Sequence, residues 1–134
     1  MPTVVSAARA PKRNRSRITS GAKLLPGVHE QSVWARIMRD SLDGLVSHCG
    51  GEEMISLTRR MVARRAAALE AELIHYEDKF ARIRAEGGVP DPAEVSAYAT
   101  WSNTQKRACE ALGWERTARD VTPSLAKYLE GEPA

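Results

Sequence analysis

Aromatic residues and cysteines are scarce in this 134-residue chain, which has three Trp, three Tyr, one Phe and two Cys. Alanine therefore supplies much of the apolar surface, and alanine buries little area per residue. A monomer of this composition would have a thin core that self-association would supplement. Cys49 and Cys109 stand outside any CxxC spacing, which is typical of a reducing cytoplasm. We expect them to be buried thiols, with one disulfide as the alternative.

Long hydrophobic runs are also missing. No stretch approaches 18 uninterrupted apolar residues, so we expect no membrane span. The apolar residues near the start, Val4, Val5, Ala7 and Ala8, are too few for the hydrophobic region of a signal peptide. We therefore expect a cytoplasmic protein. An organellar transit peptide is the alternative, because the start is rich in Arg and Ser and free of acids.

Recognisable catalytic and metal-binding motifs are absent from the sequence. It contains no glycine-rich phosphate loop, HExxH pair or nucleophile elbow. His48, Cys49, His75 and Cys109 do not have the spacing of zinc ligands. On a helix His75 and Asp78 would share a face, but two groups fall short of a catalytic set, and we interpret them as solvated. We expect no enzymatic activity, no cofactor and no metal.

Negative charge is missing from one end of the chain. The first 25 residues contain no Asp or Glu and six cations, whereas the other 109 residues hold 14 Lys and Arg against 17 Asp and Glu. The net charge of +3 is therefore +6 in this segment and −3 in the remainder. Such a segment cannot bury enough apolar surface to fold alone, and it suits a phosphate backbone. We predict that residues 1–25 form a disordered basic arm that binds double-stranded DNA through Arg9, Lys12, Arg13, Arg15, Arg17 and Lys23. The plain alternative is a solubilising tail.

The remaining residues, 26–134, are predicted to form one all-α domain. Apolar residues recur at helical spacing over about 31–49, after a candidate cap at Ser32. Gly44 lies in the middle of this helix, and we expect close packing or a bend there.

Two further helices, over about 57–86 and 92–112, are predicted to form a long antiparallel hairpin because only about five residues join them. Ser56 and Asp91 are their candidate caps. A short helix is expected over 123–130, whose apolar residues would dock on the hairpin. The segment from Arg116 onward is expected to be free to dock a partner.

The first helix of the hairpin carries an a/d heptad seam formed by Val62, Ala66, Leu69, Leu73, Tyr76, Phe80 and Ile83. We expect this seam to join copies of the chain into a homo-oligomer that Leu69→Asp or Leu73→Asp would break. The helix also begins with the basic residues Arg59, Arg60, Arg64 and Arg65. They would either extend the basic surface or pair with acids and solubilise the helix, and we favour the second interpretation.

Several stretches resemble small helical proteins encoded by prophages of alpha-proteobacteria. These are residues 24–27 (LLPG), 34–36 (WAR), 39–40 (RD), 50–52 (GGE), 64–67 (RRAA), 119–125 (RDVTPSL) and 128–129 (YL). The plan of these proteins is similar to that of phage terminase small subunits. The resemblance implies a ring of helical hairpins that binds viral DNA and regulates a large packaging subunit in a bacterial or phage-infected host.

The chain departs from that family in one respect. Residues 50–55 are longer than the turn of a helix-turn-helix module, and the helix that follows is too long for one. Phosphate contact is therefore expected, but not base-specific recognition. The alternative function is a structural or adaptor coiled-coil protein that does not bind nucleic acid.

Overall fold

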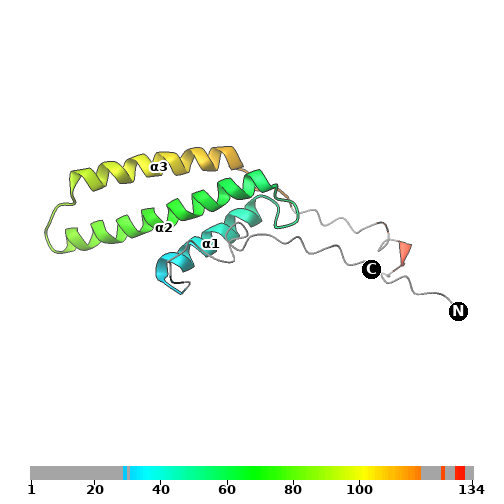
Figure 1. Cartoon of the computed structure of the whole chain (residues 1–134), viewed down its shortest axis with the longest axis horizontal. Helices are drawn as coiled ribbons and strands as arrows, with labels where there is room; N and C mark the ends of the chain where they lie inside the picture. Colours follow the sequence, from blue (N-terminus) through cyan, green and yellow to red (C-terminus); the bar gives the residue numbers. More distant parts are fainter. Residues whose placement is uncertain (1–28, 30, 119–124, 126–128, 132–134) are drawn as a thin grey trace.

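The computed structural model describes residues 29, 31–118, 125 and 129–131 of the chain. These residues form α1 (Val33–His48), α2 (Leu57–Ala85) and α3 (Pro92–Leu112), and they include no strand. α2 lies between the other two helices and contacts both (Figure 1). The all-α fold and the hairpin of α2 and α3 are therefore confirmed, and the helix ends agree with the sequence prediction to within two residues.

Two predicted segments lie wholly or mostly outside the described residues. They are the basic arm, residues 1–25, and the helix over 123–130, of which only 125, 129 and 130 are described. Leu125 and Leu129 are 74% and 75% exposed, so the expectation that they dock on the hairpin is wrong. The chain that follows α3 is bonded to the end of α1 and not to the hairpin, since the Thr117 amide donates to the His48 carbonyl at 2.8 Å.

The helices begin at side-chain caps, as the sequence predicts. The hydroxyls of Ser32 and Ser56 each accept an amide hydrogen bond from the first turn, at 3.1 and 3.2 Å. The Asp91 carboxylate does the same at 2.9 Å, and Pro92 follows it at the first helical position. Each cap satisfies an amide that has no partner within its helix. Gly87, with φ +80°, lets the chain leave α2 and enter the loop to α3.

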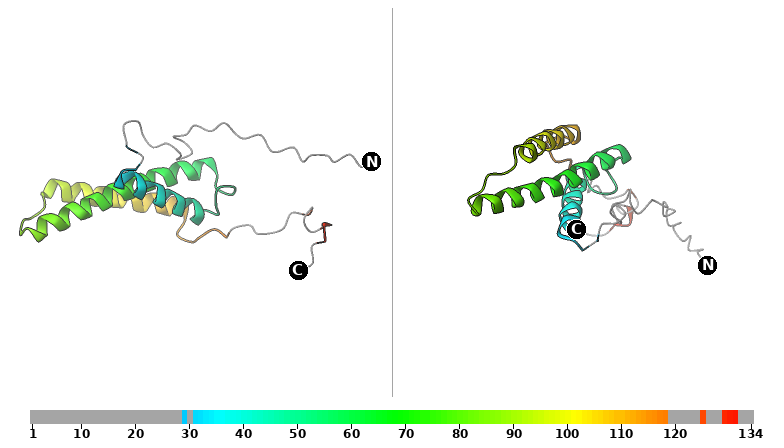
Figure 2. Two further views of the ribbon diagram at one scale, coloured as in Figure 1. Left: turned by 90° about the horizontal axis from the view of Figure 1, so that it is seen from below. Right: turned by 60° about the vertical axis from the view of Figure 1, so that its left-hand side comes forward.

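α1 packs on a stripe of alanines on α2. Ala63, Ala67 and Ala71 are at most 1% exposed and belong to one core cluster with Met38 and Leu42 of α1. Small side chains on α2 leave room for the larger side chains of α1, so Met38 is fully buried. α1 crosses the half of α2 that precedes the middle of the helix, and the tip of the hairpin extends beyond it (Figure 2).

The heptad seam of α2 faces α3 of the same chain. The ring of Tyr76 lies 5.4 Å from that of Trp101, and the ring of Phe80 lies 5.9 Å from that of Tyr98, in edge-to-face contact. All seven seam residues are buried or half-buried in a single copy of the chain. Leu73 is only 4% exposed, so Leu73→Asp would disrupt the hairpin itself, whatever the oligomeric state.

Residues 113–118 fasten the end of α3 to the end of α1. His48 Nε2 lies 2.7 Å from the Gly113 carbonyl oxygen, and the Arg116 guanidinium donates to the Ser47 hydroxyl at 2.9 Å. Arg116 and Thr117 are therefore bound to the helical body, and the expectation that the chain is free from Arg116 onward is wrong for these two residues. Among the described residues, no helix combines the length and the hydrophobicity needed to cross a membrane.

Candidate nucleic-acid interface

The six cations of the predicted arm, Arg9 to Lys23, lie outside the described residues. Within the described residues the chain leads into α1 at its N-terminal end, where the Ser32 amide donates to the His29 carbonyl at 3.0 Å. The arm is therefore joined to the helical body at the start of α1. The described residues show how charge is distributed over the helical body.

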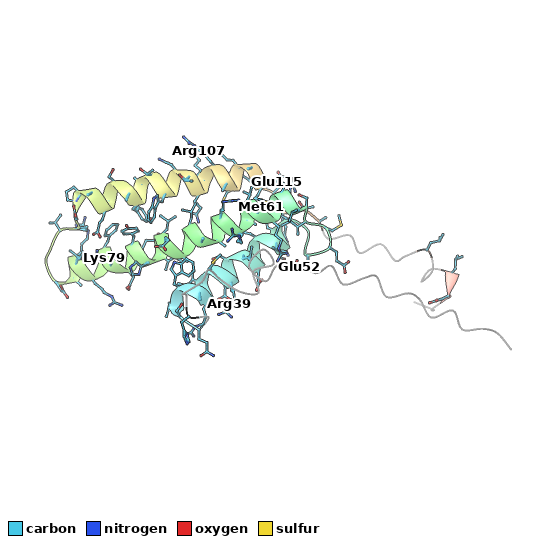
Figure 3. All side chains as sticks on the ribbon, viewed as in Figure 1. Arg39, Glu52, Met61, Lys79, Arg107 and Glu115 are labelled. Atoms are coloured by element: carbon cyan, nitrogen blue, oxygen red, sulfur yellow. The ribbon has the colours of Figure 1, made fainter. Side chains whose placement is uncertain are left out.

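Charge is divided unevenly along the hairpin. We call residues 57–71 and 99–112 the open half, because they lie away from the connecting loop, and residues 72–98 the tip half. The open half holds the six cations Arg59, Arg60, Arg64, Arg65, Lys106 and Arg107 against Glu70 and Glu110, a net charge of +4. The tip half holds three cations against six carboxylates, a net charge of −3. Figure 3 labels Arg107 near the open end of α3 and Lys79 near the far end of α2.

Two of the three cations of the tip half are neutralised locally, and Arg84 makes no salt bridge within the described residues. Lys79 pairs with Glu94 across the hairpin, and Arg82 pairs with Asp78 at 3.0 Å within α2. The hydrogen bond to Glu94 raises the pKa of Lys79 above its usual value. Asp78 is thus bound to Arg82, as its spacing predicts, and His75 is exposed. The interpretation of this His and Asp as solvated surface residues is confirmed.

Most cations of the open half are not neutralised. Arg60 is the exception, because its side chain is only 7% exposed and forms an ion pair with Glu52 in the loop before α2. The pairing interpretation is therefore correct for Arg60. It does not extend to Arg59, Arg64 and Arg65, which make no salt bridge within the described part of the chain, and the same is true of Lys106 and Arg107.

Sequence reasoning overlooked Lys106 and Arg107. Because α2 and α3 are joined by a short loop, residues at equal distances from that loop lie side by side in the hairpin. Counting back from the loop places the turn of Lys106 and Arg107 beside residues 68–71 of α2, about one turn from Arg64 and Arg65. The signal was present in the sequence, but it required pairing two segments about 40 residues apart.

Two hydrogen bonds fix the register of the hairpin. Gln105 Nε2 donates to Glu70, and the Tyr98 hydroxyl donates to Glu77 at 2.8 Å. The bond to Glu77, with a smaller contribution from burial, raises the pKa of Tyr98 above its usual value of 10.0, because only the protonated phenol can donate. These bonds hold α3 at one position along α2, so the charges of the two helices have a defined arrangement.

The thiols and hollows of the body do not form a catalytic set. Cys49 and Cys109 are free thiols, and Cys49 is buried as expected, whereas Cys109 is half-buried. Burial, and to a smaller extent Glu70, raises the pKa of Cys109, which favours the unreactive thiol form. Cys109 lines a groove of about 360 Å³ between the three helices, with Ser41, Gly44, Leu45, Ala66, Glu70 and Gln105. No three His, Cys, Asp or Glu side chains in the described ranges gather as metal ligands would.

A second hollow, of about 660 Å³, lies between the end of α1, the loop before α2 and residues 116–117. Asp43, Glu52 and Glu53 contribute carboxylates to its lining. Arg60 pairs with Glu52 and Arg116 also lines the hollow, but the remaining negative charge does not favour the approach of phosphate. No family model, curated protein or solved structure matches the chain.

Proposed function

We propose that this protein is a non-enzymatic, homo-oligomeric protein of the terminase small-subunit type, which binds the phosphate backbone of double-stranded DNA and regulates a large packaging subunit. The observation that carries the proposal is the arm of residues 1–25, with six cations and no acid. Each cation that neutralises a phosphate releases a condensed counterion, which favours binding without reading the sequence.

The helical body supports this proposal in two ways. Most of the hairpin cations that make no salt bridge lie on the half of the hairpin where α3 ends and is bonded to α1, while most hairpin acids lie at the tip. DNA held by the arm would therefore meet less electrostatic repulsion at the open half. Capped helices and the fastened chain after α3 also provide a firm body to which a basic arm can be attached.

The arm makes the proposal testable by a salt titration of binding to duplex DNA. If all six cations contact phosphates, the slope of log K against log salt should be about −5 for one arm, at roughly 0.9 per contact. Deletion of residues 1–25 should remove most of this binding while circular dichroism shows the same helix content. The matched control keeps the length of the arm and replaces its six cations with glutamine, and it should behave as the deletion does.

Either of two results would overturn the proposal. If the full chain does not bind DNA, or binds it as tightly and with the same slope after deletion of the arm, then residues 1–25 are a solubilising tail. The adaptor function would then be the better account of the chain. Binding should show little sequence preference, because phosphate contacts position a protein without specifying bases.

A further inference from the structure

The groove that Cys109 lines, here called the three-helix groove, has α2 as its floor and the two outer helices as its walls. Gly44 and Leu45 belong to the wall formed by α1, and Cys109 belongs to the wall formed by α3. Among the described residues α1 and α3 each pack on α2 but not on one another. The bond between His48 and Gly113 bridges the two walls about one turn beyond Leu45 and Cys109, so it marks one end of the groove.

The lining of the three-helix groove suits apolar side chains. Leu45, Ala66 and Cys109 contribute carbon and sulfur surface. Glu70 and Gln105 are the most polar residues of the lining, and they are hydrogen-bonded to each other. An apolar side chain that entered the groove would therefore leave that bond intact, and no polar partner would be lost. The volume of about 360 Å³ has room for a few side chains from one face of a helix, but not for a whole helix.

A single copy of the chain gives no reason for glycine at position 44. A Cβ atom there would meet nothing within 4 Å, and the φ of Gly44 is not positive, so neither packing nor backbone conformation requires glycine. Glycine inside a helix is destabilising relative to alanine. Its missing side chain does leave one wall of the groove free for the close approach of another segment.

The chain itself contains an apolar pair that its own body leaves uncovered. Leu125 and Leu129 are 74% and 75% exposed, and both positions are helical. Residues four apart lie on the same side of a helix. Helix-binding grooves recognise their partners through apolar anchors at this spacing.

The part of the chain that carries these leucines starts beside the three-helix groove. The Thr117 amide is bonded to the carbonyl of His48, at the end of the groove. Six residues, 119–124, separate Ala118 from Leu125, so Leu125 can lie up to about 25 Å from the body. That reach extends to a neighbouring copy. Because both leucines are exposed in one copy, the body of a second copy is the surface that can cover them.

We propose that Leu125 and Leu129 of one copy dock in the three-helix groove of a second copy, and that this contact joins copies of the chain. The inference rests on the homo-oligomer of the proposed function and identifies its interface. Each copy offers one groove and one pair of leucines, so the contact is heterologous and can be repeated from copy to copy. The seam of α2 then serves to hold the hairpin together within each copy.

Cys109 provides a position-specific test, because it is a half-buried free thiol in the groove whereas Cys49 is buried. A Leu129→Cys variant of the full chain, treated with a short bismaleimide, should give covalent dimers and larger species. These should disappear when Cys109→Ser is added. Val89→Cys is the matched control, since Val89 is 79% exposed at the tip of the hairpin, and it should give no link to Cys109.

Light scattering tests the assembly itself. A chain that ends after Ala118 and the double variant Leu125→Asp with Leu129→Asp should both be monomers. Gly44→Gln places a side chain on the groove wall and should weaken assembly by at least about tenfold, as the loss of central interface contacts does. Val89→Asp with Val95→Asp changes two exposed residues at the tip in the same way, and this control should assemble like the full chain.

The outcomes separate this inference from the proposed function. If the truncated chain assembles as the full chain does, the groove contact is overturned and the homo-oligomer stands. A cross-linked product of monomer mass, from Cys109 of the same copy, would overturn the exchange between copies. A full chain that stays monomeric at every concentration would overturn the homo-oligomer as well, whereas DNA binding by the arm is measured separately by the salt titration. Urea denaturation in dilute solution, where the copies are separate, should give equal stability with and without residues 119–134.

Discussion

Neighbouring arginines of one helix have different roles because they point in different directions. Arg60 lies on the side of α2 that faces α1, where its side chain is 7% exposed and Glu52 neutralises it. An arginine in such a place needs a partner, because burying an unpaired charge is costly. Arg65 lies five residues further along the same helix, on another side of it, and is exposed. Arg60 therefore stabilises the loop between α1 and α2, whereas the guanidinium of Arg65 is accessible from solvent.

Two glycines should respond in opposite ways to alanine substitution. A Cβ atom at Gly44 would meet nothing within 4 Å, so the expectation of close packing there is wrong. Gly44→Ala should raise the free energy of unfolding by about 0.5–1 kcal/mol, since alanine is the better helix former. At Gly50, with φ +100°, a Cβ would lie 3.0 Å from the Cβ of Met54, so Gly50→Ala should lower it. Urea denaturation measures both, and a destabilised Gly44→Ala variant would contradict the structure.

α2 is an element with two packing sides. One side carries the alanines that α1 covers, and the other carries the large residues of the seam that α3 covers. Each side suits its neighbour, because small residues admit the side chains of α1 whereas aromatic rings fill the space toward α3. The remaining surface of α2 is exposed and holds Leu57 and Met61 besides Arg65.

Two leucines of α2 allow the seam and the exposed surface of this helix to be compared with the same substitution. Leu73 is 4% exposed and Leu57 is 62% exposed. Leu73→Ala should lower the free energy of unfolding by about 2–4 kcal/mol, because it removes buried methyl groups and leaves a cavity. Leu57→Ala should change it by less than about 0.5 kcal/mol. Similar losses in urea denaturation would show that the seam is not packed against α3 in the monomer, as it would be if it served only to join copies.

At the scale of the whole molecule, the segment that follows α3 is hydrogen-bonded to the end of α1. The hydrogen bonds of Gly113, Arg116 and Thr117 to the end of α1 connect parts of the sequence more than 60 residues apart. α1 and α3 otherwise each pack on α2, so these bonds link the two outer helices. The three helices are thereby joined into one unit, and the tip of the hairpin, formed by α2 and α3 alone, projects beyond α1 (Figure 2).

Truncation tests this closure. A chain that ends after Ala118 keeps all three contacts with α1, whereas a chain that ends after Gly113 loses those of Arg116 and Thr117. The shorter chain should be less stable by about 1–2 kcal/mol, at roughly 1 kcal/mol for each hydrogen bond lost. The chain that ends after Ala118 should be as stable as the full chain. Thermal and urea denaturation measure the difference, and equal stability of the two truncations would mean that residues 114–118 contribute nothing to the body.

The sequence by itself determined the positions of α1, α2 and α3, their caps and the antiparallel hairpin. These features depend on local physics: a serine or aspartate side chain caps the amides next to it, a glycine permits positive φ, and a short loop forces adjacent helices together. The tertiary structure decided which side of α2 meets which helix, that Arg60 is buried, and which cations keep their charge free of carboxylates. Helical periodicity shows which side of a helix is apolar but does not identify the helix that packs against that side. Alanine, common on both buried and exposed helix surfaces, gave no sign that α1 would pack there.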